Sequence, residues 1–116
     1  MRRAIRTEAF LANLPLFAGL HPEELARLAA GTRRLRLRRG ATLFGQGEPS
    51  TGIHALVHGR IALSTRQPNG KERVSAILCA GRSFAEAIVF LEKPYIVSAT
   101  ALTDALVLHV AKETVF

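Results

Sequence analysis

The spacing of hydrophobic residues changes once along the chain. In the N-terminal part, apolar residues recur every three to four positions, and this predicts two short amphipathic helices over residues 3–11 and 22–30. Pro22 suits the first turn of the second helix, and Gly31 is a stop signal directly after it. The chain therefore begins with a predicted helical hairpin.

After the helices, short apolar runs are separated by residues that favour turns. The clearest pair of runs, 60–66 and 72–79, flanks an Asn-Gly sequence that is typical of a tight β-hairpin. Further strands are predicted over 97–102 and 105–110, and residues 112–116 have the character of the first turn of a truncated helix. Five or more strands at this spacing predict a mainly β fold, either a sandwich or a roll.

The first predicted strand, over residues 32–39, is strongly basic. Its period of two places leucines on one face and arginines on the other, the arginines being Arg34, Arg36 and Arg38. The formal net charge of the chain is +7, which leaves direct contact with nucleic acid as an alternative. Because no aromatic residues interleave the arginines, as single-strand binders require, we interpret this as a half-buried strand with a solvated basic face that protects a sheet edge.

Length and composition indicate one compact unit. A chain of 116 residues with 48% hydrophobic and 22% charged residues predicts a single domain over residues 1–116. Cys79 is the only cysteine, so an internal disulfide is excluded and a reducing compartment is indicated. Because Cys79 lies in an apolar run, it is predicted to be buried.

No apolar run approaches the ~18 residues that a transmembrane helix needs. Glu8, Asn13 and Pro15 interrupt the apolar stretch near the N-terminus, where a secretory signal would be unbroken. The sequence therefore predicts a cytoplasmic protein without membrane association.

Three collinear motifs carry a resemblance to a known family. They are Leu16-Phe-x-Gly-Leu-x-Pro-Glu-Glu-Leu25, Gly40-x-x-Leu-Phe-x-x-Gly47-Glu and Ile53-x-x-Leu-Val-x-Gly59-Arg-Ile-Ala-Leu63. Together they resemble the sensor domain of Crp/Fnr-type bacterial transcription regulators. The resemblance implies a double-stranded β-helix (jelly roll) that binds a small-molecule effector. It also implies that the full-length protein is a homodimer that reads DNA through a C-terminal domain absent from this chain.

Residues 81–100 correspond to the ligand-binding cassette of that family. Its cyclic-nucleotide branch has a Gly-Glu pair, whose glutamate accepts the ribose hydroxyl, and a later Arg-Ser pair, whose arginine binds the phosphate. Glu86 matches the glutamate, Ala85 replaces the glycine, and the arginine position falls on Ile96 or Val97. Cyclic nucleotide binding is therefore disfavoured, although cyclic AMP remains the alternative effector.

The cassette also supplies the residues expected to line the effector pocket. Glu86 has an alternative structural role, as an acceptor of backbone N–H groups in the following loop. Arg82 is included as a polar contact. The predicted pocket residues are Arg82, Phe84, Glu86, Ala87, Phe90 and Tyr95.

Other sensing chemistries of the family can be compared with the residues present. An iron–sulfur cluster needs about four cysteine thiolates and is excluded. Residues 83–91 are similar to the dissimilatory nitrate respiration regulators, a branch that senses nitric oxide through haem, so haem is a candidate cofactor. His21, on the helical hairpin, is the candidate axial ligand, and its alternative role is an exposed N-cap. His109 is predicted to point outward from the last strand, and its alternative is a ligand that points inward.

A metal-dependent cupin enzyme is the remaining alternative, because cupins share the β-roll. His54 and His58 share a strand face, but four residues of strand span about 13 Å, too far for one metal ion. No carboxylate follows them before Glu72. The sequence therefore predicts a protein that is not an enzyme, with His58 exposed next to Gly59.

Overall fold

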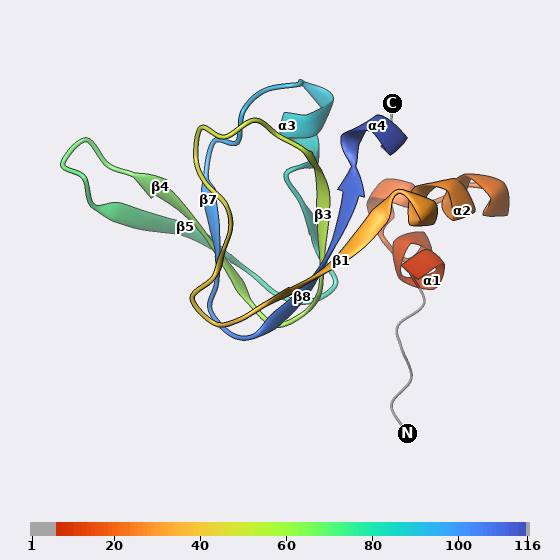
Figure 1. The fold of residues 1–116 in the computed structure, drawn as a ribbon, viewed down its shortest axis with the longest axis horizontal. Helices are drawn as coiled ribbons and strands as arrows, with labels where there is room; N and C mark the ends of the chain where they lie inside the picture. Colours follow the sequence, from red (N-terminus) through yellow and green to blue (C-terminus); the bar gives the residue numbers. More distant parts are fainter. Residues whose placement is uncertain (1–6, 116) are drawn as a thin grey trace.

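The computed structural model describes residues 7–115, which form a β roll flanked by short helices (Figure 1). The helices are α1 (Thr7–Ala12), the 3-10 helix η1 (Pro15–Phe17), α2 (Pro22–Ala30), α3 (Glu86–Phe90) and α4 (Lys112–Val115). The strands are β1 (Thr32–Leu37), β2 (Thr42–Phe44), β3 (Gly52–His58), β4 (Ile61–Arg66), β5 (Glu72–Leu78), β6 (Ser83–Phe84), β7 (Ser98–Ala101) and β8 (Ala105–Ala111). The mainly β fold is therefore confirmed.

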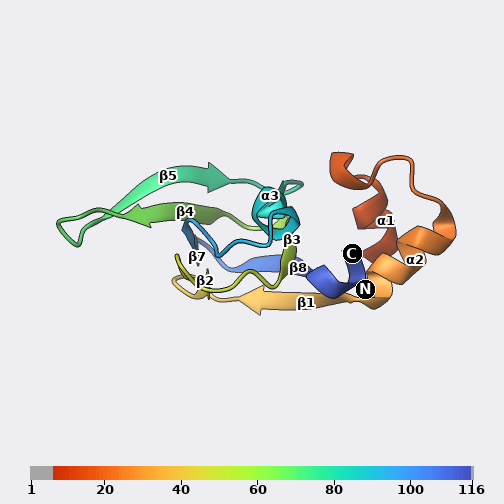
Figure 2. The same ribbon diagram turned by 90° about the horizontal axis from the view of Figure 1, so that it is seen from above.

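The strands form two four-stranded sheets that pack face to face. One sheet has the order β1-β8-β3-β6 and the other the order β2-β7-β4-β5, and every pairing is antiparallel. Figures 1 and 2 show α1 and α2 packed at one end of the roll, while α3 caps its upper side. This is the jelly-roll arrangement with a helical hairpin that the sequence predicts.

The second helix begins and ends where the sequence places it. Pro22 occupies its first turn, and the Glu24 carboxylate accepts the backbone N–H of His21 at 3.0 Å, which satisfies one of the unpaired donors of a helix start. The first helix begins at Thr7, and the predicted residues 3–6 lie outside the described part. No helix within residues 7–115 is long and apolar enough to span a bilayer.

Strands β3 and β8 are buried on both faces because they lie between two apolar layers. One face packs under the helical hairpin, where Ile53 and Leu108 are fully buried, and the other packs inside the roll, where Leu56 and Val107 are fully buried. Side chains of alternate residues therefore point into different cores. The basic strand β1 lies outside this arrangement, at the edge of the sheet.

The β4–β5 hairpin projects away from the body of the roll (Figures 1 and 2). The hairpin turn contains Gly70 with a φ of 83°, the conformation for which glycine is favoured. Strand β5 is a sheet edge, and Val74 and Ile77 are 57% and 54% exposed. Cys79, which follows β5, is also exposed, so the prediction that it is buried is wrong. An apolar run was mistaken for a core segment, although no layer covers this strand.

Candidate functional site

The cassette folds into β6, the short helix α3 and a loop that leads into β7. Ala85 connects β6 to α3 and adopts the left-handed conformation, with φ 68° and ψ 11°. A residue with a Cβ atom pays roughly 1–2 kcal/mol to adopt this left-handed conformation, whereas glycine adopts it freely. The left-handed backbone therefore agrees with the glycine that the resemblance leads us to expect at the position of Ala85.

An apolar cavity of about 200 Å³ lies between α3 and the interior of the roll. Phe84 and Tyr95, two of the predicted pocket residues, contribute its aromatic wall. The complete lining is Phe44, Leu63, Phe84, Ala85, Ile88, Tyr95, Ile96 and Val97. No charged side chain is among these residues, so the cavity favours an uncharged and mainly apolar guest.

Aromatic rings pack tightly behind this cavity. Phe44 and Tyr95 stack with ring centroids 3.8 Å apart and planes inclined by 12°. The ring of His54 lies on the far side of Phe44 and Phe84, with centroid distances of 5.2 and 5.4 Å. Since these rings are buried, they fix the shape of the cavity wall.

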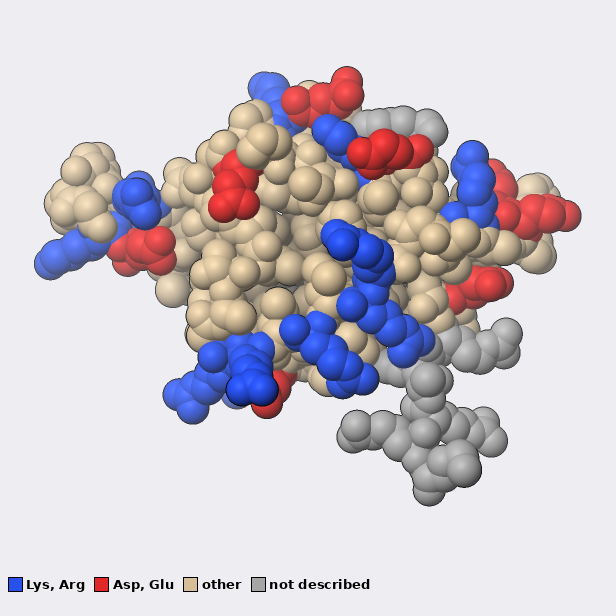
Figure 3. All heavy atoms as spheres, in the orientation of Figure 1, with Lys and Arg blue, Asp and Glu red and all other residues tan. Residues whose placement is uncertain are grey.

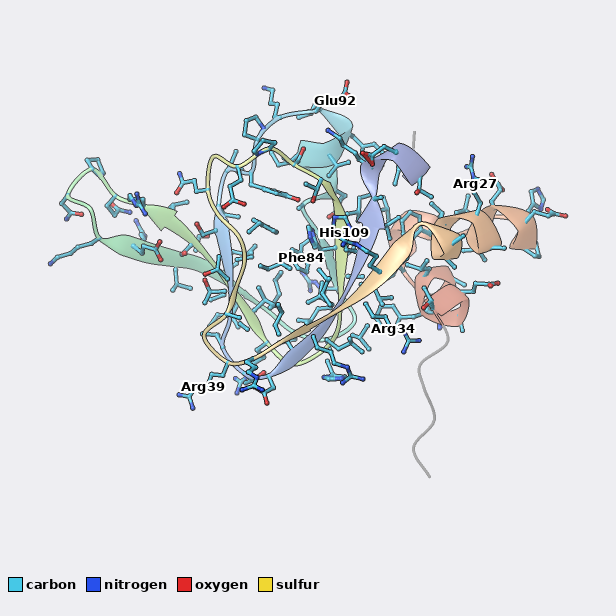
Figure 4. All side chains as sticks on the ribbon, viewed as in Figure 1. Arg27, Arg34, Arg39, Phe84, Glu92 and His109 are labelled. Atoms are coloured by element: carbon cyan, nitrogen blue, oxygen red, sulfur yellow. The ribbon has the colours of Figure 1, made fainter. Side chains whose placement is uncertain are left out.

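Two histidines are buried inside the roll, contrary to the prediction that His109 points outward. His54 is 2% exposed and His109 is 6% exposed, and their ring centroids are 5.0 Å apart. Figure 4 shows Phe84 and His109 in the interior of the roll. Both Nδ1 atoms are buried without a hydrogen-bond partner in the described part of the chain. His109 points inward because β8 is covered on both faces, so neither of its faces is available to solvent.

Burial keeps these histidines uncharged. Desolvation, with a smaller contribution from His109, lowers the pKa of His54 to about 3. Desolvation also lowers the pKa of His109, assisted by the positive charge of Arg33. At neutral pH the two buried histidines, His54 and His109, are therefore uncharged.

A short hydrogen-bond chain links the cavity wall to the C-terminal helix. The Tyr95 hydroxyl accepts the backbone N–H of Thr51 at 3.1 Å, and Thr51 Oγ1 is 2.9 Å from His109 Nε2. The carbonyl of Thr51 in turn accepts the backbone N–H of Lys112, the first residue of α4, at 3.0 Å. Thr51 therefore contacts both the ligand cavity wall and the beginning of α4.

The polar cassette residues lie in a separate hollow on the side of the helical hairpin. Arg82 and Glu86 line this hollow together with Ser83, Pro15 and other residues. The Glu86 carboxylate accepts a hydrogen bond from the Ser83 hydroxyl, and the oxygen–oxygen distance of 3.4 Å is long for such a bond. Glu86 is thus not among the residues that line the apolar cavity. Its contact is with a side-chain hydroxyl before α3 and not with the backbone N–H groups of the following loop, which were its alternative structural role.

The six predicted pocket residues do not share one hollow. Phe84 and Tyr95 line the apolar cavity, whereas Arg82 and Glu86 line the polar hollow. Phe90 faces a third depression, which it shares with residues of η1, α2 and α4. Ala87 is exposed and is absent from the linings of all three.

The position of the phosphate-binding arginine is apolar whichever alignment is used. Ile96 is 63% exposed at the rim of the cavity, and Val97 is partly buried in its wall. Ser98 Oγ accepts the backbone N–H of Gln46 at 2.9 Å. Its hydroxyl therefore already has a partner within the protein.

The remaining histidines lie away from the cavity. His21 is the exposed N-cap of α2, as its alternative role predicted, and it does not line the cavity. His58 is exposed, as predicted, but a bulge between Leu56 and His58 removes it from the face that His54 shares. Within residues 7–115, no three side chains of the types that bind metals are close enough to hold one ion.

Sequence reasoning missed Phe44, Leu63 and Ile88 as cavity residues. Ile88 lies within the cassette, in α3. Phe44 and Leu63 lie outside the cassette, and the antiparallel pairing of β2 and β4 with β7 brings them to the site. The signal available in the sequence was their apolar character, and only Leu63 lies in a predicted strand. It could not show which core they would join.

Comparisons with known proteins agree with this geometry. Residues 34–116 match the family model of the cyclic nucleotide-binding domain. Over 97 residues the chain is 29% identical to a CRP-like cAMP-activated global transcriptional regulator of Mycobacterium tuberculosis, an overlap of 84% of this chain and 43% of that protein. The chain thus spans less than half the length of that relative.

Two solved structures share both fold and sequence similarity. The sensor domain of the transcriptional regulator DNR from Pseudomonas aeruginosa superposes with a TM-score of 0.86 at 28% identity, over 92% of this chain and 72% of that one. The N-terminal domain of a transcriptional regulator from Streptomyces coelicolor gives 0.80 at 30% identity, over 90% and 73%. By its family match and its relatives, the chain belongs to the cyclic nucleotide-binding domains of the Crp/Fnr family.

Proposed function

We propose that the chain is the effector-sensing domain of a Crp/Fnr-type transcription regulator whose effector is a small, uncharged and mainly apolar molecule rather than cyclic AMP. One observation carries this proposal: the cavity beside α3 is lined without a single charged side chain. Phe84 and Tyr95 would contact the effector, and Ile96 or Val97 occupies the position from which an arginine would bind a phosphate.

The missing arginine has a large energetic effect. A cyclic phosphate placed in an apolar cavity would lose its hydration without gaining a counter-charge, and an unpaired buried charge costs roughly 3–5 kcal/mol. That range corresponds to a loss of more than a hundredfold in affinity, since each 1.4 kcal/mol is about tenfold. Glu86 does not compensate, because its carboxylate lines the other hollow.

Cyclic AMP is the second candidate, and two observations favour it. The relative from Mycobacterium tuberculosis is named as cAMP-activated, and the cassette retains Glu86 at the position of the ribose-binding glutamate. A cavity of about 200 Å³ is, however, below the roughly 300–1,000 Å³ of typical ligand pockets. The apolar effector therefore agrees better with the size and lining of the site.

Haem, which the similarity to nitrate respiration regulators suggested, does not fit the cavity as the described residues form it. An axial ligand is needed, and Tyr95 is the one lining residue of a type that binds haem iron. Its hydroxyl is instead held by the backbone N–H of Thr51 at 3.1 Å and lies 3.3 Å from Thr51 Oγ1. His54 lies behind Phe44 and Phe84, and His21 is on the surface of α2. No step of the proposed function therefore involves haem.

The wider role follows from the named relatives, which are transcriptional regulators. In this proposal the full-length protein is a cytoplasmic homodimer that binds DNA through a domain outside this chain, and it has no enzymatic activity. The domain contributes an equilibrium between two conformations, which an effector shifts only if it binds them with different affinity.

Titrations with three ligands test the proposal. The uncharged fluorophore N-phenyl-1-naphthylamine is expected to bind at one saturable site, while calorimetry with cyclic AMP gives no saturable heat at micromolar concentration and haem gives no stoichiometric Soret band. Ile88→Phe, which fills the cavity, should weaken binding of the fluorophore at least tenfold. Ala87→Phe adds the same ring at an exposed neighbouring position and should leave it unchanged. Saturable cyclic AMP binding would overturn the proposal in favour of the nucleotide.

A further inference from the structure

The edge strand β1 and two adjacent loops present a row of arginines that the sensor function does not use. Arg34 and Arg36 project from β1, Arg38 and Arg39 follow it, and Arg60 follows β3; all five are exposed. We refer to these residues as the arginine face. Figure 3 shows basic side chains gathered along the lower part of the molecule, and Figure 4 places Arg34 and Arg39 along that edge.

Local structure explains why these side chains share one side. Leu35 and Leu37 pack into the core of the roll, so the alternate residues of β1 point outward. The Asp104 carboxylate accepts the backbone N–H of Arg39 at 2.9 Å, and the Thr103 hydroxyl accepts that of Arg60 at 3.1 Å. The two loops that carry Arg39 and Arg60 are thereby held against the same short turn between β7 and β8.

The positive charges of this face are not neutralised by the protein. Within residues 7–115, none of the five guanidinium groups is paired with a carboxylate. Asp104 is the acidic residue bonded to the face, and its recorded bond is to a backbone N–H rather than to a guanidinium group. The chain as a whole has a net charge of +7. The face therefore presents a field that attracts polyanions.

We infer that the arginine face binds the phosphate backbone of double-stranded DNA, independently of base sequence. Arg34 and Arg36 on β1 and Arg38 directly after it span about 13 Å if the chain stays extended, a length over which one DNA strand presents about four phosphates. The planar guanidinium fork matches phosphate oxygens better than a lysine ammonium does. Protection of a sheet edge, the simpler explanation, needs charges on the edge strand and does not account for Arg39 and Arg60, which lie on the adjoining loops.

The composition of the face favours DNA over other polyanions. Single-stranded nucleic acid is bound on aromatic stacking platforms, and the one strongly exposed aromatic among the described residues, Phe90, lies on α3. Proteins that lie on anionic membranes insert apolar side chains beside their basic residues, whereas no exposed large apolar side chain lies on β1. The remaining partner is double-stranded DNA, contacted at its phosphate backbone and not at its bases. Such contacts would add affinity for DNA near a site that another domain selects.

Fluorescence anisotropy with the full chain and a labelled 30-base-pair duplex of arbitrary sequence tests this inference. Each phosphate contact contributes about 0.9 to the slope of log K against log salt concentration. The triple variant Arg34→Gln, Arg36→Gln, Arg38→Gln should therefore reduce that slope by about 2.7 and the affinity at 50 mM salt at least tenfold. Circular dichroism should show unchanged thermal unfolding, since all three side chains are exposed.

A control variant separates this face from net charge. Arg27→Gln, Arg66→Gln, Arg73→Gln removes the same charge from exposed positions on α2 and the β4–β5 hairpin, and should change the slope by less than one. Equal effects of the two triple variants would overturn the inference, as would tighter binding to vesicles of one part anionic to three parts neutral lipid than to the duplex. Binding of N-phenyl-1-naphthylamine should be unaffected in both variants, so failure of this inference is distinguishable from failure of the proposed function.

Discussion

The two sides of α3 differ sharply, although both are built from the same twenty-residue cassette. On the side of the roll, Phe84, Tyr95 and Val97 form an apolar wall. On the side of the helical hairpin, Arg82 and Glu86 line a polar hollow. A nucleotide would need a carboxylate and a cation beside an apolar pocket. Here both charged residues lie on one surface and the apolar pocket lies on the other.

Under the proposed function, this difference separates the fold of the cassette from the recognition of its ligand. The left-handed turn at Ala85 and the short helix α3 are retained, because they depend on the backbone and on apolar packing. The charge that recognises phosphate is a single side chain, and its replacement by Ile96 or Val97 leaves the packing intact. Experiments on the two sides should therefore give effects of different size.

Truncation of the apolar wall should have the largest effect. Phe84→Ala removes a 5% exposed ring that packs against Phe44 and His54, and loss of such a ring costs about 3–5 kcal/mol of unfolding free energy. Glu86→Ala, on the polar side, should cost less than about 1 kcal/mol, since its hydrogen bond is long. Urea denaturation measures both, and comparable losses would contradict the division between the two sides.

Acidification should destabilise the apolar side through its histidines. The folded-state pKa of His54, about 3, lies below the ordinary histidine value of 6.5, so the unfolded chain binds more protons between these values. Stability is therefore unaffected by this group above about pH 6.5 and falls below it by about 1 kcal/mol per pH unit.

Urea midpoints measured from pH 7 to pH 4.5 test this pH dependence. His109, whose pKa is also lowered, adds to the loss, while Glu113 opposes it. His54→Phe should reduce the slope of stability against pH. His58→Phe, at an exposed position, should retain it. Equal slopes in the two variants would contradict the assignment to His54.

An added arginine should restore part of the nucleotide site. Val97→Arg places a cation in the wall of the cavity, and a charge-assisted pair with phosphate should raise affinity for cyclic AMP about tenfold relative to the native chain. Ile96→Arg, at the 63% exposed rim, should raise it less than about threefold because solvent screens the pair. Calorimetry gives both values, and a larger gain at Ile96 would assign the phosphate position to that residue.

The smallest expected effect is at the turn that both sides share. Ala85→Gly relieves the left-handed strain at φ 68°, offset by the greater freedom of glycine in the unfolded chain, so stability should rise by about 0.5–1 kcal/mol. Ala87→Gly, a substitution within α3 two residues after Ala85, should lower stability by about 0.5–1 kcal/mol. Opposite signs in thermal unfolding are the expected result, and a loss in both variants would show that Ala85 is not strained.

The fold was predictable from sequence because it rests on local signals. The Pro22 start and Gly31 stop of α2 and the Asn-Gly turn of the β4–β5 hairpin all lie where the residues place them. The alternation of β1 likewise gives exposed arginines opposite Leu35 and Leu37. Each of these features is determined by neighbours within a few residues.

The site was harder to predict because burial depends on which layers cover a strand. His109 was expected to face solvent, but β8 has one core above it and another below it. Cys79 was expected to be buried, but β5 has no layer over it. Phe84 and Tyr95 are predicted from the resemblance of residues 81–100 to a ligand-binding cassette, whereas the separation of Glu86 from them depends on which way the single turn of α3 faces.

Thr51 gives the cavity an energetic connection to the end of the described chain. Its N–H is held by the Tyr95 hydroxyl in the cavity wall, and its carbonyl holds the first N–H of α4. In the proposed function, a guest that displaces Tyr95 is therefore expected to change the free energy with which α4 is held, and linkage makes this coupling reciprocal. Thr51 is the residue through which a small molecule and a helix would be connected.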